Sequence, residues 1–310
     1  MENPLYFIAF DTGGTKTDAV LFAQDGTVLR HTVTPGANPL DLGLEEACRR
    51  YRAAIDGLRE GLNMPIRCLY ASIACIEHYG DRIPAYLRSL VPEATVRAEN
   101  DGNCLISAMI GHRDGACMIC GTGSALCYRF GEECGHIGGW GYLVDSCGSG
   151  FVLAQKALNA MVREMDGRLD HTLLTELFEQ RTGETLRQHY ARLYAGGRPY
   201  IASFASLVFE ARRRGDRAAA LIFDDCVQDL SELVWTGYRR FGGGYRLILN
   251  GGIFRHYPEY VQALRAHVPP EVEIMESDAN PVYGCAVEAM YDAGLECGAA
   301  FKRRFLESCK

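Results

Sequence analysis

The segment 5–33, which reads LYFIAFDTGGTKTDAVLFAQDGTVLRHTV, constrains the fold of this chain more than any other stretch. An apolar, aromatic-rich run of strand length ends at Asp11, and the polar, glycine-rich residues 12–17 interrupt it. Two further strand-like runs lie on either side of Asp25-Gly26, a strong hairpin-turn signal. The pattern predicts three strands joined by two tight turns, over residues 5–10, 18–23 and 27–33.

The first of these turns has the residues of a phosphate-binding loop. Adjacent glycines let the backbone approach a ligand closely, and successive N–H groups in such a turn suit a phosphate. Asp11, at the end of the first strand, is a candidate ligand of a hydrated Mg²⁺ beside that phosphate. An ordinary hairpin is the alternative, since short glycine motifs are common and neither a Walker nor a dinucleotide motif is present. The turn comprises Gly13, Gly14, Thr15, Lys16 and Thr17.

A second glycine turn repeats this arrangement within residues 116–130. Strand-like residues 116–120 and 125–130 flank a turn that is rich in glycine and hydroxyl groups. Two such turns facing each other across a cleft would hold a polyphosphate from both sides. We therefore interpret the two turns as a pair, the second comprising Gly121, Thr122, Gly123 and Ser124.

Asp101 lies where a predicted strand ends and a predicted helix begins. As a helix cap or first-turn residue it needs no further function. As a general base it would accept the proton of a hydroxyl group that attacks a γ-phosphoryl group. The residues alone leave both interpretations open.

Three other places are candidates for ligand contact. Asn38 precedes an amphipathic helix predicted over 44–59, and an asparagine there is more typical of a turn or helix entry than of ligand contact. Trp140 lies within GGWGY, which predicts either a flat apolar surface for a sugar ring or a tight loop held by a buried tryptophan. Gly251 and Gly252 follow a predicted strand and open a helix, so a flat adenine or ribose could approach the backbone there.

The chain contains 13 cysteines, many of them inside apolar patterns. In a reducing cytosol most are expected to be small buried hydrophobic residues. Cys117 and Cys120 form a C-x-x-C pair with Cys134 and His136 downstream, which is one arrangement of a structural zinc site. Because the pair lies in a strand-like run, we favour burial in the core over zinc.

Composition narrows the class of protein. The 310 residues suffice for two domains, and 48% hydrophobic with 23% charged residues is typical of soluble globular proteins. The net charge of −7 argues against a nucleic-acid-binding or membrane-binding surface. We expect a cytoplasmic location, because the chain starts without the features of a signal peptide and no run approaches the ~20 apolar residues of a membrane span. Residues 151–241 have an almost continuous helical pattern.

Four ordered motifs make the chain resemble a known family. They read DTGGTKTDAVLF, CGTGSALC, LNGGIF and PVYGCAVEAM. They are similar to motifs of the N-acetylglucosamine kinase and BadF-BadG-BcrA-BcrD ATPase family, within the sugar kinase, Hsp70 and actin superfamily. The resemblance implies an α/β fold of two ribonuclease-H-like (actin-like ATPase) domains with a nucleotide in the cleft between them. It implies domains at 1–113 and 114–310, the second with a helical insertion and an adenosine site, and a last helix that could pack on the first domain.

The resemblance also implies an activity, the Mg²⁺-dependent transfer of phosphate from ATP to an amino sugar. The expected reaction converts N-acetylglucosamine to its 6-phosphate, with Asp101 as general base and with Asp11 and Asp101 at the metal. The two glycine turns, Gly251 and Gly252 would bind ATP. A small-molecule substrate and a homodimer are expected, without nucleic acid or membrane. The implied sugar-binding residues are Asn38, Asn100, Thr122, Gly139, Trp140 and Asp145.

One loop departs from the family pattern and leaves alternatives open. Many relatives read GDEGS where this chain reads DSCGS, so the expected sugar-binding acid falls on Ser146, with Asp145 one position earlier. Glucosamine and N-acetylmuramate are therefore alternative substrates, and a kinase that has lost its activity is a further alternative. The chain could also be an ATPase that activates a partner enzyme, as do activators of 2-hydroxyacyl-CoA dehydratases. Their iron–sulfur cluster would use Cys147 and Cys120 here.

Overall fold

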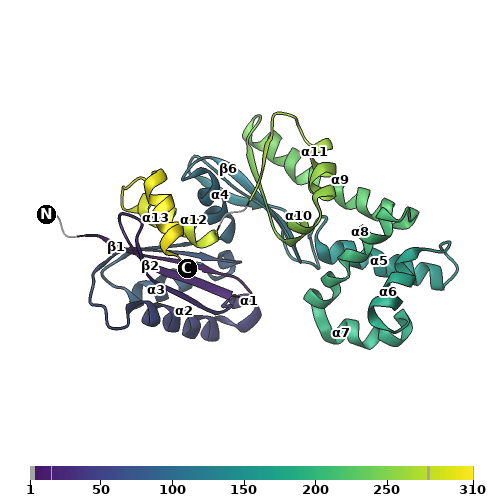
Figure 1. The fold of residues 1–310 in the computed structure, drawn as a ribbon, viewed down its shortest axis with the longest axis horizontal. Coiled ribbons are helices and arrows are strands. Elements are labelled where there is room, and N and C mark those ends of the chain that lie inside the picture. The colour runs from purple at the N-terminus through teal and green to yellow at the C-terminus, as the bar shows by residue number, and fades with distance from the viewer. Residues whose placement is uncertain (1–3, 15, 278–279, 310) are drawn as a thin grey trace. The chain divides into compact units, whose positions relative to one another are not determined.

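The computed structural model describes residues 4–14, 16–277 and 280–309 (Figure 1). The chain packs as two units: unit 1 comprises residues 1–114 and 277–310, and unit 2 comprises residues 115–276. The C-terminal segment 277–310 packs with unit 1, whereas the resemblance includes it in the second domain, with a last helix that could pack on the first. No helix in the described part of the chain has the length and apolar character needed to traverse a bilayer.

Unit 1 is built on a five-stranded sheet with the order β3-β2-β1-β4-β5. β2 pairs antiparallel with both β1 and β3, whereas β4 pairs parallel with both β1 and β5. The predicted sequence of strand, turn, strand, turn and strand is confirmed. The strands are β1 (Tyr6–Thr12), β2 (Lys16–Ala23), β3 (Val28–Pro35), β4 (Ile66–Ile73) and β5 (Thr95–Glu99).

Helices cover both faces of this sheet, which is why β1 reads as a continuous apolar run rather than an alternating one. Tyr51 of α2 meets Phe10 of β1 edge-on, with ring centroids 5.5 Å apart. On the opposite face Phe22 of β2 contacts Phe301 and Phe305 of α13 edge-on. The helices are α1 (Pro39–Leu42), α2 (Leu44–Arg59), α3 (Arg82–Leu90), α4 (Asp101–Ile110), α12 (Pro281–Asp292), α13 (Ala299–Ser308) and the short 3₁₀ helix η1 (Ile76–Tyr79).

Unit 2 repeats the topology of unit 1, with the sheet order β10-β9-β6-β7-β8. β7 pairs antiparallel with β6 and β8, and β9 pairs parallel with β6 and β10. The strands are β6 (Gly115–Cys120), β7 (Ser124–Phe130), β8 (Glu133–Ile137), β9 (Arg246–Asn250) and β10 (Glu273–Glu276).

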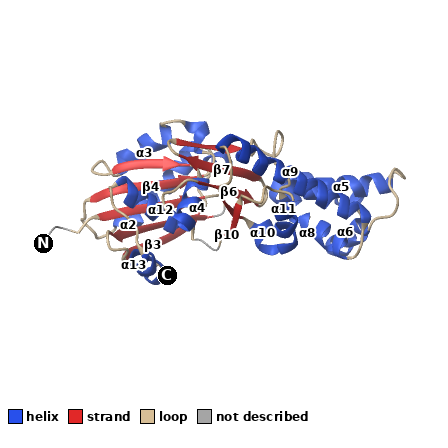
Figure 2. Cartoon of the chain, turned by 90° about the horizontal axis from the view of Figure 1, so that it is seen from above, coloured by secondary structure: helices blue, strands red, loops and turns tan. Residues whose placement is uncertain are grey.

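A layer of helices separates β8 from β9 along the chain of unit 2, as the sequence predicts. Figure 2 shows α5, α6, α8 and α9 of this layer packed together. Its apolar faces bury a core that includes Phe178, Phe209 and Phe223. Two shorter helices follow β9. The helices of unit 2 are α5 (Gly150–Met165), α6 (Leu173–Thr182), α7 (Leu186–Ser203), α8 (Ala205–Arg213), α9 (Arg217–Phe241), α10 (Gly252–His256) and α11 (Pro258–Ala266).

In unit 1, α4 and α12 approach each other so closely that one position must be glycine. A Cβ atom at Gly284 of α12 would lie 1.8 Å from the carbonyl oxygen of Cys104 in α4. Because this neighbour is backbone rather than a movable side chain, the helices would have to separate to make room. Gly284 therefore sets the distance between the two helices.

A buried carboxylate holds the same two helices to the sheet. Glu288 of α12 is fully buried, and it bonds Arg97 of β5 as well as Ser107 of α4. His112 Nδ1 lies 2.9 Å from its Oε2. Arg97 also donates from Nε to Asp292 Oδ2 at 2.9 Å. The charge of Glu288 is thus compensated by groups that lie far from it in the sequence, as a buried charge requires.

We predict that Gly284→Ala destabilises the protein by about 2–3 kcal/mol, because overpacking of this contact forces the backbones apart. The matched control is Gly57→Ala in the interior of α2, where a Cβ would meet its nearest neighbour, Thr32 Oγ1, at an ordinary 3.8 Å. This control should stabilise the protein by about 0.5–1 kcal/mol, because alanine is the better helix former. Urea unfolding curves of both variants measure the effect, and equal midpoints would contradict the prediction.

Candidate active site

The end of β1 carries a carboxylate that is held by the neighbouring strand. Asp11 pairs with Ser72 of β4 in the sheet register, and Ser72 Oγ donates to Asp11 Oδ1 at 2.7 Å. Burial raises the pKa of the Asp11 carboxyl to about 6, and the hydrogen bond from Ser72 opposes this rise. Within the described part of the chain, the hydrogen bonds to Asp11 all reach Oδ1. Oδ2 is therefore free to bind a hard cation such as Mg²⁺.

Asp101 is the first residue of α4, and only Asn100 separates it from the end of β5. Its neighbour Asn100 is the N-cap, because Asn100 Oδ1 accepts from the Gly102 amide at 3.1 Å. Burial raises the pKa of the Asp101 carboxyl to about 7, and the negative charges of Asp11 and Glu77 add to this rise. Asp101 is thus a first-turn residue rather than the cap. A carboxyl group that titrates near neutral pH beside a second carboxylate is suited to accepting a proton.

In the turn between β1 and β2, two of the predicted phosphate-binding side chains are bonded to other residues of unit 1. Lys16 Nζ donates to Asp18 Oδ2 at 2.8 Å, and the buried Thr17 hydroxyl bonds Thr12 Oγ1 at 2.7 Å. Thr15 lies outside the described residues. Gly13 has open space where a Cβ would be, and its amide donates to the Lys16 carbonyl at 3.1 Å, which closes the turn.

Asn38 is the N-cap of α1. Its Oδ1 accepts from the Leu40 amide at 2.9 Å, which is the helix-entry role that the sequence leaves open. Its amide nitrogen has no hydrogen-bond partner among the residues that the structure describes. That group remains available to a ligand.

In unit 2, the turn between β6 and β7 is fastened to the start of α5. The Gly121 carbonyl accepts from the Gly150 amide at 2.8 Å, and the Thr122 carbonyl accepts from the Phe151 amide at 3.1 Å. Ser124 Oγ donates to the Cys147 carbonyl at 2.5 Å. The glycine-rich turn and the N-terminus of α5 therefore form one hydrogen-bonded arrangement, in which the first amides of the helix are paired with carbonyls of the turn.

The glycine pair after β9 packs against this turn. Gly251 has a φ of +119°, and a Cβ there would lie 2.2 Å from the Cys120 carbonyl oxygen at the end of β6. Only glycine fits both the backbone angle and the close approach. The structure thus brings together, within unit 2, the segments 121–124 and 251–252 that the sequence analysis assigns to phosphate and adenosine.

The loop around Trp140 is exposed rather than held by a buried tryptophan. Trp140 is 65% exposed, and its ring lies 5.1 Å from that of His136. Leu143 and Val144 are also exposed. The adjacent Gly139 has a φ of +79° and a Cβ there would lie 2.5 Å from Ala125 Cβ, so glycine is required. Trp140 presents an apolar ring surface to solvent, where a sugar ring could stack.

Asp145 and Ser146 occupy different environments. Asp145 Oδ1 accepts from the Cys147 thiol at 3.0 Å. Ser146 is buried, and its hydroxyl bonds the hydroxyl of Ser149, the N-cap of α5, at 2.9 Å. The Ser146 hydroxyl is therefore engaged in the helix cap, whereas the Asp145 carboxylate is the acidic group of this loop.

Four cysteines of unit 2 are buried core residues, whereas Cys147 is half-buried and Cys134 is exposed. Cys117 and Cys120 are fully buried in β6, as favoured from the sequence. In the described part of the chain, the single group of three close metal-ligating residues is Asp11, Cys104 and Cys285, and it includes neither this pair nor Cys147. The observations thus favour neither the zinc site nor an iron–sulfur cluster in unit 2.

Sequence reasoning missed Ser72, which bonds Asp11, and Glu77, which bonds Asn100 and whose charge raises the pKa of Asp101. Ser72 and Glu77 come from the end of β4 and from η1, and neither belongs to a glycine motif. One signal could have identified Ser72. It is a hydroxyl residue near the end of an apolar strand, and that strand can be expected to lie beside the first strand. Cys104 and Cys285 left no such signal, because their approach depends on how α4 and α12 pack.

Comparison with known proteins agrees with this architecture. Residues 10–289 match the model of the BadF/BadG/BcrA/BcrD ATPase family. The chain is 28% identical over 241 residues to an N-acetylmuramic acid/N-acetylglucosamine kinase of Clostridium acetobutylicum, covering 73% of this chain and 76% of that protein. It is 25% identical to an N-acetyl-D-glucosamine kinase of Dictyostelium discoideum, covering 92% and 97%.

Solved structures show the same fold. A candidate N-acetylglucosamine kinase from Porphyromonas gingivalis superposes with a TM-score of 0.69 at 22% identity, covering 94% of this chain and 100% of that one. A ROK family glucokinase from Streptomyces griseus superposes with a TM-score of 0.53 at 17% identity, covering 92% and 98%. The fold is therefore that of two ribonuclease-H-like, actin-like ATPase domains, and the chain belongs to the BadF/BadG/BcrA/BcrD ATPase family.

Proposed function

We propose that this protein is an ATP-dependent sugar kinase that phosphorylates an amino sugar, with N-acetylglucosamine as substrate and its 6-phosphate as product. The observation that carries the proposal is Asp101, whose carboxyl lies at the β5–α4 junction near Asp11 and titrates near neutral pH. The names of the similar proteins, kinases of N-acetylglucosamine and N-acetylmuramic acid, support the substrate class. A homodimer and a cytoplasmic location belong to the same proposal.

In the proposed mechanism, Asp101 takes the proton of the sugar hydroxyl as that oxygen attacks the γ-phosphoryl group. Asp11 would hold Mg²⁺ through Oδ2, with Asp101 beside it, and the ion neutralises charge on the phosphates when bound. The turns 13–17 and 121–124 bind phosphates through backbone N–H groups, and 251–252 admits the adenosine. Asn38, Asn100, Thr122, Gly139, Trp140 and Asp145 contact the sugar.

The first test replaces the proposed base. Asp101→Asn should lower kcat by about 10²–10⁴-fold, the usual loss on removing a general base, with little change in ATP affinity. Folding should survive, because Asn100 rather than Asp101 caps α4. Asp81→Asn, at an exposed aspartate that pairs with Arg88, is the control and should retain activity.

The assay is the release of ADP from Mg-ATP with each of five sugars: N-acetylglucosamine, glucosamine, N-acetylmuramate, N-acetylmannosamine and glucose. N-acetylglucosamine should give the highest kcat/KM. A folded Asp101→Asn protein with normal sugar-dependent ADP release would refute the base, and wild-type protein inactive on all five sugars would refute the kinase.

A second test separates Asp145 from Ser146. Asp145→Ala should raise the KM for the sugar about 10-fold or more, because a carboxylate that accepts hydroxyl hydrogen bonds is lost. Ser146→Ala should leave that KM nearly unchanged and lower stability by about 1 kcal/mol, since its hydroxyl supports the α5 cap. Steady-state kinetics and thermal unfolding of the two variants provide the comparison, and an unchanged KM in Asp145→Ala would exclude this side chain from sugar binding.

A further inference from the structure

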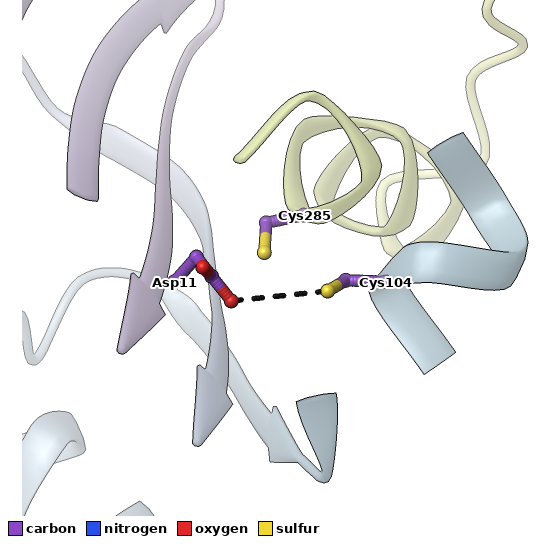
Figure 3. Close-up of side chains that lie close together, drawn as sticks. All are labelled: Asp11, Cys104 and Cys285. Carbon is purple, nitrogen blue, oxygen red and sulfur yellow. Dashed lines mark hydrogen bonds between the residues drawn. The ribbon is translucent and has the colours of Figure 1, made fainter. Parts of the chain in front are cut away.

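Three side chains from separate elements of unit 1 converge on one point (Figure 3). Asp11 comes from the end of β1, Cys104 from α4 and Cys285 from α12. One carboxylate oxygen and the two sulfur atoms all lie within 4.8 Å of one another. The Cys104 sulfur lies 3.9 Å from Asp11 Oδ1. Both thiols are fully buried, so the two sulfur atoms are shielded from solvent.

The packing of the helices holds the two sulfur atoms in place. Gly284 lets α12 approach the Cys104 carbonyl of α4, and Cys285 is the next residue in α12. The Cys104 sulfur also lies 3.0 Å from the Asp101 carbonyl oxygen and 3.3 Å from Ser72 Oγ. The convergence is therefore built into the backbone and does not depend on exposed, mobile side chains.

We propose that Asp11, Cys104 and Cys285 form a binding site for a thiophilic divalent cation, for which Zn²⁺ and Cd²⁺ are the probes. Tetrahedral zinc, with bonds of about 2.3 Å to sulfur and about 2.1 Å to oxygen, places its sulfur and oxygen ligands roughly 3.6 Å apart. The observed 3.9 Å between Cys104 Sγ and Asp11 Oδ1 is close to this separation. Two thiolates and one carboxylate are a ligand set that suits zinc and cadmium rather than Mg²⁺.

Binding is a simple exchange of protons for metal. Each thiol loses its proton to solvent as its sulfur bonds the cation, so two protons are released from the thiols and no group is oxidised or reduced. The fourth position is left to water or to the Ser72 hydroxyl, which lies 2.7 Å from Asp11 Oδ1.

A cation at this site would bind the same carboxylate that, in the proposed mechanism, holds Mg²⁺ through Oδ2. Its positive charge beside Oδ2 would weaken Mg²⁺ binding, so a thiophilic cation bound here would inhibit the proposed kinase. The site itself goes beyond the proposed function, and its existence is tested by direct binding. If the protein had no kinase activity, the measurement of metal binding would still test the site.

The experiment is a titration of the reduced full-length protein with Cd²⁺, followed by the ultraviolet charge-transfer absorption of cadmium thiolates and by equilibrium dialysis. Wild-type protein should bind one equivalent more than Cys104→Ala/Cys285→Ala, and the variant should lose the corresponding absorption. Cys48→Ala, at a half-exposed cysteine of α2, is the control and should bind as the wild type does. Equal binding and equal absorption in the wild type and the double variant would overturn the proposal.

A second measurement needs no variant and so does not depend on how a variant folds. Native protein is alkylated with iodoacetamide with and without Zn²⁺, and each cysteine is quantified by peptide mass spectrometry. Zn²⁺ should lower the labelling of Cys104 and Cys285 severalfold, whereas Cys68, equally buried in unit 1, should be unchanged. Unchanged labelling of Cys104 and Cys285 at saturating Zn²⁺ would overturn the proposal as well.

Discussion

The backbone contact between α4 and α12 is the constraint on which the candidate site in unit 1 depends. Because Gly284 has no side chain, α12 lies against the Cys104 carbonyl, and Glu288 one turn later reaches Arg97 and Ser107. The same contact fixes the start of α4, where Asp101 lies, relative to β1 and Asp11. A loss of this packing would therefore alter the site without touching any residue in it.

The two sheets have the same strand order and pairing, and this repetition explains why the sequence was informative. In each unit, a glycine-rich turn joins the first strand to its antiparallel neighbour, and the turn stands out because it interrupts a strongly apolar run. The helix over 44–59 and the helical stretch after residue 150 were equally clear, since their apolar positions keep helical spacing over several turns. β8 was not predicted, because its residues 133–137 form an edge strand with charged and exposed positions.

The candidate site could be predicted only where local sequence carries the signal. Asp101 was found from a strand-to-helix junction, but Asn100 as the cap and Ser72 as the partner of Asp11 required the register between strands. The approach of Cys104 to Cys285 joins residues far apart in the chain, and no spacing rule reports it. The exposure of Trp140 could not be predicted either, because its position among glycines is compatible with a buried or an exposed side chain.

Unit 1 is assembled from two pieces of chain that are separated by the whole of unit 2, and this has a consequence for the order of events on the ribosome. Residues 1–114 emerge first, but the face of their sheet that carries Phe7 and Phe22 is incompletely covered until α12 and α13 have been made, since Phe22 packs against Phe301 and Phe305 of α13. Unit 2 is continuous and can complete its core in the meantime. The N-terminal sheet therefore exposes aromatic side chains while the rest of the chain is being synthesised. This architecture requires that these side chains be protected from aggregation during that time.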